Sequence, residues 1–236
     1  MSQPRHAGPE RVGGRVPWID VARGAAMLMI VIGHAYLPWD GHPTAFTFIY
    51  AFHVPAFFLL SGLVHRTRGR SLTAWLRGRV RTILVPYLTW ALVSVVLFDV
   101  VGGLAAQILH RRGPTSLSQD LWGIVWANPS EHLMDWNKPL WFLPAITVAY
   151  LLATGVERLG VPLPVWILAS VGLSWWTVAR TTPALPWSLE RVVVLMPFFL
   201  IGAWLRGPLL GAAAGRTGGS TRTREATRTR GSTRTG

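Results

Sequence analysis

The fold is decided by the first long apolar stretch of the chain, residues 18–39, which reads WIDVARGAAMLMIVIGHAYLPW. A helix rises about 1.5 Å per residue, so this stretch is long enough to cross the roughly 30 Å hydrocarbon core of a bilayer. It nevertheless contains two ionisable side chains, Arg23 and His34. A charged group costs about 2.5 to 3.5 kcal/mol at the centre of a membrane helix, so such residues usually face a bundle interior and carry function.

The spacing of Arg23 and His34 places both side chains on one face of that helix. Eleven residues at about 100° each return to within about 20° of the starting direction, and they advance the helix by about 16 Å. The sequence therefore predicts one polar stripe, with a guanidinium toward one end and an imidazole toward the other.

The composition is that of a multi-spanning membrane protein. Half of the 236 residues are hydrophobic, only 14% are charged, and the apolar residues fall in long blocks, which is typical of an all-α, polytopic transmembrane helix bundle. The absence of cysteine excludes disulfides and thiolate metal sites, and no histidine pattern typical of metal ligation occurs. The net charge of +13 comes from arginines at the ends of apolar segments, as topology requires. We therefore expect the lipid bilayer as partner, no nucleic acid and no metal.

Six segments are apolar enough to span the membrane, and flanking charge predicts their orientation. They cover residues 18–39, 46–64, 82–101, 139–156, 162–179 and 190–205. Arginines precede the first segment and fill the connection between the second and third, which places the N-terminus and that connection in the cytoplasm. We expect a cytoplasmic segment over residues 1–16, a multi-pass domain over 17–206 in the plasma membrane, and a disordered, basic, low-complexity tail over 207–236.

A long connection between the third and fourth spans, residues 102–138, lies on the opposite side and is rich in tryptophan. Within it, five residues predict a helix lying in the membrane interface. They are Leu121, Trp122, Ile124, Val125 and Trp126. Two interpretations remain open, because the segment is either an aromatic belt or a cover over an acceptor site on the outer face.

His34 is the candidate general base, because neutral imidazole is the side chain best matched to proton transfer near pH 7. Its structural alternative is a histidine that is hydrogen-bonded within a helix interface. Arg23 is the candidate anchor for an anionic cofactor from the cytoplasm, since a guanidinium binds phosphate or carboxylate through two parallel hydrogen bonds. Its alternatives are a side chain that extends to the headgroups or one that pairs with Asp20.

Further candidates for substrate or donor binding each have an ordinary structural alternative. They are Asp20, His53, Ser61, Arg77, Arg79, Arg81 and Trp141. His53 lies near the outer start of the second span, at a depth similar to that of His34. The three arginines at the entrance of the third span either bind a nucleotide phosphate or only set topology. Ser61 either contacts substrate or permits close packing beside Gly62, and Trp141 is otherwise an interface anchor.

Four motifs follow one another along the chain. They are Trp18-Ile19-Asp20 with Arg23-Gly24 and Gly33-His34, then His53-Val54-Pro55-Ala56-Phe57-Phe58-Leu59-Leu60-Ser61-Gly62, then Arg81 with Pro86-Tyr87, and then Leu140-Trp141-Phe142-Leu143. In this order they resemble the acyltransferase-3 family of integral membrane O-acyltransferases, and within it the branch similar to fucose 4-O-acetylase. The resemblance covers about residues 17–206 and is strongest in roughly the first 90.

The resemblance implies a polytopic enzyme that takes an acyl group, usually acetyl, from cytoplasmic acyl-CoA and delivers it to a hydroxyl, commonly of a carbohydrate. In that reaction His34 is the general base and Arg23 anchors the donor, so acetyl-CoA is the expected donor substrate. Family members usually have about ten spans, which implies that this chain is truncated at its C-terminus. Its arginine cluster also departs from the pair of arginines, separated by two residues, that many members carry.

Two other functions remain open. Intramembrane arginine and histidine also line the substrate path of a glycan or lipid transporter or flippase, although such proteins usually show paired repeats with broken helices. The other is an inactive or truncated homologue that persists as a membrane scaffold or is degraded. Assembly into a homo-oligomer is likewise left open.

Overall fold

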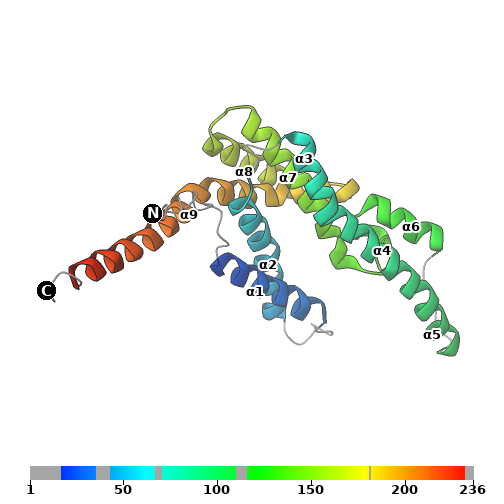
Figure 1. The fold of residues 1–236 in the computed structure, drawn as a ribbon. Helices are drawn as coiled ribbons and strands as arrows, with labels where there is room; N and C mark the ends of the chain where they lie inside the picture. The colour runs from blue at the N-terminus through cyan, green and yellow to red at the C-terminus, as the bar shows by residue number, and fades with distance from the viewer. Residues whose placement is uncertain (1–16, 36–42, 67–70, 110–115, 181, 232–236) are drawn as a thin grey trace. The chain divides into compact units, whose positions relative to one another are not determined.

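A computed structural model describes residues 17–35, 43–66, 71–109, 116–180 and 182–231 of the chain. Within these ranges the fold is helical and contains no strand (Figure 1). Three helices there are long and apolar enough to cross a membrane, namely Leu72–Ile108, Lys138–Arg158 and Pro186–Leu210. The expectation of an all-α fold with membrane-spanning helices is therefore confirmed, whereas the count of six spans and the side of the N-terminus stay predictions.

Two compact units, Met1–His53 and Val54–Gly236, make up the chain. The first contains α1 (Pro17–Ala35) and the start of α2 (Pro43–Leu63). The second contains the rest of α2 and α3 (Leu72–Arg79), α4 (Val85–Leu97), α5 (Gly103–Ile108), α6 (Leu117–Trp126), α7 (Phe142–Arg158), α8 (Leu163–Ala179) and α9 (Leu189–Gly231). The six predicted spans fall on α1, α2, α4, α7, α8 and α9.

α3, α4 and α5 form one continuous helix, because two π turns, Val80–Leu84 and Phe98–Gly102, join them. Buried residues recur along it at multiples of four positions, from Trp75 through Tyr87 to Val95. In a regular α-helix, residues four positions apart differ in direction by about 40°. Over the five such steps from Trp75 to Val95, the side chain would therefore turn to the opposite face. The i→i+5 hydrogen bonds of a π turn widen the helix and take up part of that drift. Trp75 and Tyr87 consequently both face the rest of their unit.

Two hydrophobic clusters hold the second unit together. The larger cluster joins α2, α3, α7 and α9 through Phe58, Trp75, Ala145, Ile146, Ala149, Tyr150, Ala153, Val192, Leu195, Met196, Phe199 and Leu200. The smaller cluster joins α4, α6 and the loop that follows α6 through Tyr87, Ala91, Val95, Ile124, Ala127, Met134 and Trp136. α4 and α6 thus lie side by side (Figure 1). α8 packs on α9, where the Ser174 hydroxyl donates to the Val193 carbonyl at 2.9 Å.

α2 and α9 cross at two glycines. A Cβ added to Gly62 would lie 1.9 Å from the carbonyl oxygen of Phe199, and one added to Gly202 would lie 2.0 Å from that of Leu59. Neither position has room for a methyl group, so glycine is required on both helices. Small residues allow this close backbone approach between membrane helices, which agrees with the packing interpretation of Ser61 and Gly62.

The first and last helices do not end where the sequence predicted. α9 continues as a helix to Gly231, so the disorder predicted for residues 207–236 is not confirmed. α1 ends at Ala35, and the last four residues of the first predicted span lie outside the described residues, as do residues 1–16 and 232–236.

Candidate active site

α1 carries Arg23 and His34 beside its buried stripe. Ile19, Ala26 and Gly33 are buried at intervals of seven residues, and Arg23 and His34 are both half-buried. Seen down the helix axis, these two side chains lie at about 40° and about 60° from Ile19. The predicted common face is therefore present in the helix, with the cation and the imidazole about 16 Å apart along the axis.

The start of α2 brings a second imidazole to His34. His53 is buried, and its Nδ1 lies 2.5 Å from the Ile49 carbonyl oxygen one turn earlier. A carbonyl only accepts hydrogen bonds, so Nδ1 is the donor in this contact. His34 and His53 lie close enough to interact electrostatically, so the first unit holds two imidazoles together. Asp20, in contrast, is exposed.

The predicted arginine cluster divides between two faces of the continuous α3–α4 helix. Arg77 and Arg81 are exposed, whereas Arg79 is half-buried. The Arg79 guanidinium carbon lies 3.6 Å from the centre of the Tyr150 ring and 5.6 Å from that of the Trp75 ring. These are cation–π contacts, which favour a guanidinium packed on aromatic faces. Arg79 therefore belongs to the packed interior, and Arg77 and Arg81 direct their charge outward.

A buried polar cluster that the sequence did not indicate joins α2, α7 and α9. His65 is 1% exposed, its Nε2 lies 3.7 Å from Glu157 Oε1, and its carbonyl oxygen accepts a 2.7 Å hydrogen bond from Arg206 Nη1. Burial lowers the pKa of His65 to about 4, with Glu157 acting to raise it and Arg79 and Arg206 to lower it. This histidine is consequently neutral at pH 7. In the sequence, this cluster is indicated only by the position of His65, Glu157 and Arg206 at the ends of apolar segments.

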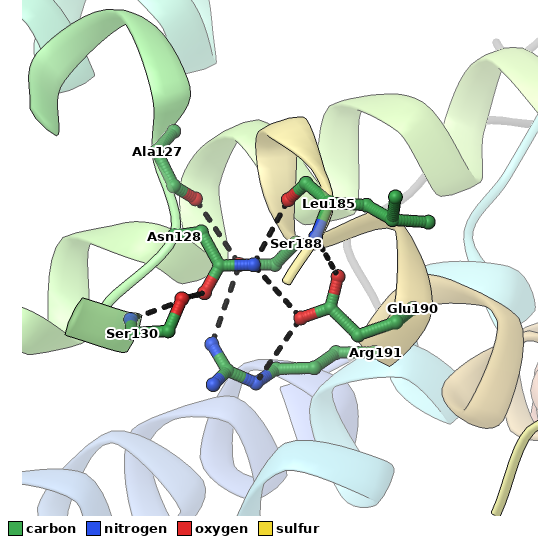
Figure 2. A network of polar contacts seen from close by, with 7 residues as sticks. All are labelled: Ala127, Asn128, Ser130, Leu185, Ser188, Glu190 and Arg191. Carbon is green, nitrogen blue, oxygen red and sulfur yellow. Dashed lines mark hydrogen bonds and ion pairs between the residues drawn. The ribbon is translucent and has the colours of Figure 1, made fainter. Parts of the chain in front are cut away.

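A second polar network holds two loops together at the start of α9 (Figure 2). Asn128 is fully buried, and its Nδ2 donates to the Leu185 carbonyl at 2.9 Å and to Glu190 Oε1 at 2.8 Å. Its Oδ1 accepts from the Ser130 hydroxyl at 2.7 Å. Glu190 Oε2 in turn accepts from the Leu185 amide at 3.0 Å. A buried network in which donors and acceptors are matched in this way rigidifies the segments that it joins.

Trp141 lies beside this network. The Arg191 guanidinium carbon lies 5.0 Å from the centre of a Trp141 ring, and Arg191 Nη1 lies 3.3 Å from Ser188 Oγ, to which it donates. One face of the indole is therefore covered by arginine. The sequence singled out Trp141 but missed Asn128 and Glu190, because polar residues in a loop or at a helix start are ordinary surface features until their burial is known.

The candidate residues of the second unit do not form one cluster. Ser61 is buried beside the glycine crossing of α2 and α9. Arg79 packs on Tyr150, and Trp141 packs under Arg191. Among the predicted site residues, a cation and imidazoles therefore occur in the same unit only in the first unit, as Arg23, His34 and His53.

Apolar helices of spanning length, with ionisable side chains on one helix face, define a multi-pass membrane protein. The chain belongs to the acyltransferase-3 family, whose family model, described as an acyltransferase domain, matches residues 16–207. The protein is therefore a membrane acyltransferase. The match contains every candidate residue named above. No curated protein and no solved structure matches the chain.

Proposed function

We propose that this acyltransferase moves an acetyl group from acetyl-CoA to a hydroxyl of a carbohydrate or glycan at the plasma membrane, in the manner of the fucose 4-O-acetylase-like branch. Membership of the acyltransferase-3 family supports the reaction class. The observation that carries the finer proposal is the shared face of α1, where Arg23 and His34 are both half-buried. This face offers an anion-binding group and a proton acceptor at different depths of one helix.

His34 acts as the general base in the proposed reaction. It accepts the proton of the acceptor hydroxyl while that oxygen attacks the carbonyl carbon of the thioester. The new C–O bond replaces the C–S bond, and the thiolate of CoA leaves and takes up a proton. Imidazole suits this role because its ordinary pKa lies near neutral pH. His53, as the neighbouring imidazole, would orient His34 or share the proton.

Arg23 holds the donor in the proposed reaction. Its guanidinium can form two parallel hydrogen bonds to a phosphate of CoA. Arg77 and Arg81 are exposed and stay candidates for binding a nucleotide phosphate, whereas the Arg79 guanidinium packs on the Tyr150 ring. Donor binding by Arg23 predicts an effect on the KM for acetyl-CoA, and proton transfer by His34 predicts an effect on kcat.

The test is acetylation of glycan acceptors by membranes that carry the wild-type chain or a variant. His34→Ala should lower kcat by roughly 10²- to 10⁴-fold, the usual contribution of a general base. Arg23→Ala should raise the KM for acetyl-CoA, and Arg23→Lys should restore part of the affinity because the charge is kept. The matched control is His132→Ala, which removes a histidine that is 76% exposed at its side chain, and it should leave both constants unchanged.

Acetylation that is unchanged in His34→Ala would refute the assigned role of that residue. A separate measurement tests the donor. Binding of acetyl-CoA should raise the thermal stability of the purified protein, by about 2.7 kcal/mol at a concentration of 100 times Kd. A wild-type chain that shows neither acetylation nor a thermal shift would contradict the proposal as a whole.

A further inference from the structure

α6 begins and ends with defined local signals. At its start the Ser116 hydroxyl oxygen accepts from the Gln119 amide at 3.4 Å, as an N-cap does. At its end Ala127 adopts a left-handed conformation with φ of 51°, which stops the helix. The helix between them has 10 residues and is about 15 Å long. It is therefore too short to cross a hydrocarbon core of roughly 30 Å.

One face of α6 is buried against protein. Asp120, Gly123 and Ile124 lie on this face and are buried. The Tyr87 hydroxyl of α4 donates to the Ile124 carbonyl at 2.6 Å. A Cβ added to Gly123 would lie 1.7 Å from the Leu133 carbonyl oxygen, so the following loop also contacts this face. The position of α6 on α4 is thus set by close packing.

The other face of α6 is apolar and exposed. Leu117, Leu121, Trp122 and Val125 are 56%, 43%, 51% and 61% exposed, and they fall within about 140° of one another around the helix. The only exposed polar side chain on α6 is Ser118, in its first turn. A water-facing helix of a soluble protein would carry charged or polar residues here. This apolar stripe therefore requires a non-aqueous surface.

The apolar stripe belongs to a helix that packs on a candidate membrane span. α4, on which α6 packs, lies within the candidate span Leu72–Ile108, and its exposed side chains include Leu88 and Leu92. Beyond the end of α6, the loop carries the exposed, polar Glu131 and His132. Polar groups thus occur at both ends of a short helix whose middle is apolar. Short amphipathic helices with tryptophan on the apolar side lie in the membrane interface.

We propose that α6 lies in the plane of the membrane interface, on the side away from the arginines of α3, with Leu117, Leu121, Trp122 and Val125 inserted among lipid chains. The partner of this surface is the boundary between headgroups and acyl chains. This inference rests on the membrane location of α4 and not on the acyl transfer reaction. Ile124, which is buried, lies on the protein side of the helix.

The absence of cysteine makes the depth of α6 measurable with single nitroxide labels. The test compares Leu121→Cys and Val125→Cys in proteoliposomes with two reference sites. Leu168→Cys, in the first half of the apolar helix α8 and 73% exposed, is the reference for the hydrocarbon, and the exposed Arg66→Cys is the reference for water. For each label, the collision rate with oxygen is divided by that with a water-soluble nickel complex. We expect mobile labels at both α6 sites and ratios between the two reference values.

Three results would overturn the proposal. Ratios equal to that at residue 66 would mean that the stripe faces water. Strongly immobilised labels with low access to both reagents would mean that protein, from another copy or another segment, covers it. Ratios equal to that at residue 168 would place α6 in the hydrocarbon core. Because the two α6 sites are exposed and independent, misfolding of one variant does not remove the test.

Discussion

At the scale of single residues, histidine shows how strongly burial alters side-chain chemistry. His34 is half-buried and His53 is buried, yet they lie close enough to interact. His65 is also buried, but it lies at the end of α2 among aromatic rings, with Glu157 as the nearest anion. The same residue type therefore serves as a candidate base in one place and as a neutral packing element in another.

The first prediction concerns the pH dependence of stability. In the folded chain the pKa of His65 is about 4, below its ordinary value of 6.5. The unfolded state binds more protons between these values, so stability is full above about pH 6.5 and falls as the pH drops toward 4. The loss attributable to this group is on the order of 3 kcal/mol. Chemical unfolding in detergent micelles between pH 4 and 7 should show a smaller fall for His65→Gln than for wild type.

A second variant separates burial from charge in this prediction. Glu157 acts to raise the pKa of His65, so Glu157→Gln should retain the fall in stability and extend it to lower pH. An equal pH slope in wild type and His65→Gln would show that burial of this imidazole does not govern acid sensitivity.

At the scale of helices, close approach depends on where glycine lies and not on how many glycines a helix has. Gly62 and Gly202 each face a backbone carbonyl of the partner helix, whereas a Cβ added to Gly155 or Gly172 would meet nothing within 4 Å. Hydrophobicity predicts that α2 and α9 are helices. It does not predict that the two helices touch. An apolar side chain is equally stable against lipid tails and against another helix, so hydrophobicity alone does not drive their contact.

We predict opposite effects of alanine at these positions. Gly62→Ala and Gly202→Ala should destabilise the protein by about 2 kcal/mol or more, since the backbone must separate to admit a methyl group. Gly172→Ala in α8 should be neutral or stabilise by up to about 1 kcal/mol, because alanine restricts the unfolded chain and favours helix. Thermal unfolding of the three purified variants measures this. Similar melting temperatures for Gly62→Ala and Gly172→Ala would contradict the crossing.

At the scale of the whole second unit, one buried asparagine joins segments that are distant in sequence. Asn128 in the loop after α6 bonds to Leu185 and to Glu190 at the start of α9. Trp187 Nε1 donates to the Val125 carbonyl at 3.1 Å across the same junction. These bonds satisfy backbone groups of two irregular segments, as the low-dielectric interior of a membrane protein requires.

Replacement of Asn128 should therefore weaken the whole unit. Asn128→Ala removes the donor to the Leu185 carbonyl and to Glu190 Oε1, and we expect a loss of about 3 kcal/mol in the free energy of unfolding. Asn128→Asp should not restore it, since a carboxylate cannot donate and repels Glu190. The matched control is Asn137→Ala, which loses one 2.9 Å side-chain bond to Ser94 and should cost about 1 kcal/mol. Equal losses at the two asparagines would contradict this role.

The sequence by itself determined the helical class, the positions of the apolar helices and the shared face of Arg23 and His34. Each of these follows from periodicity and composition within one segment, where chain connectivity sets the geometry. It also predicted a helix near Trp122 in the long loop, where α6 lies.

Only the tertiary structure decided which polar residues are buried and which helices touch. The division of Arg79 from Arg77 and Arg81, the neutral His65 and the Asn128 network all depend on side chains that come from other segments. Burial is a property of neighbours distant in sequence, and no local pattern encodes it. For the same reason the family could be recognised from motifs along the chain, whereas the packing around those motifs required the structure.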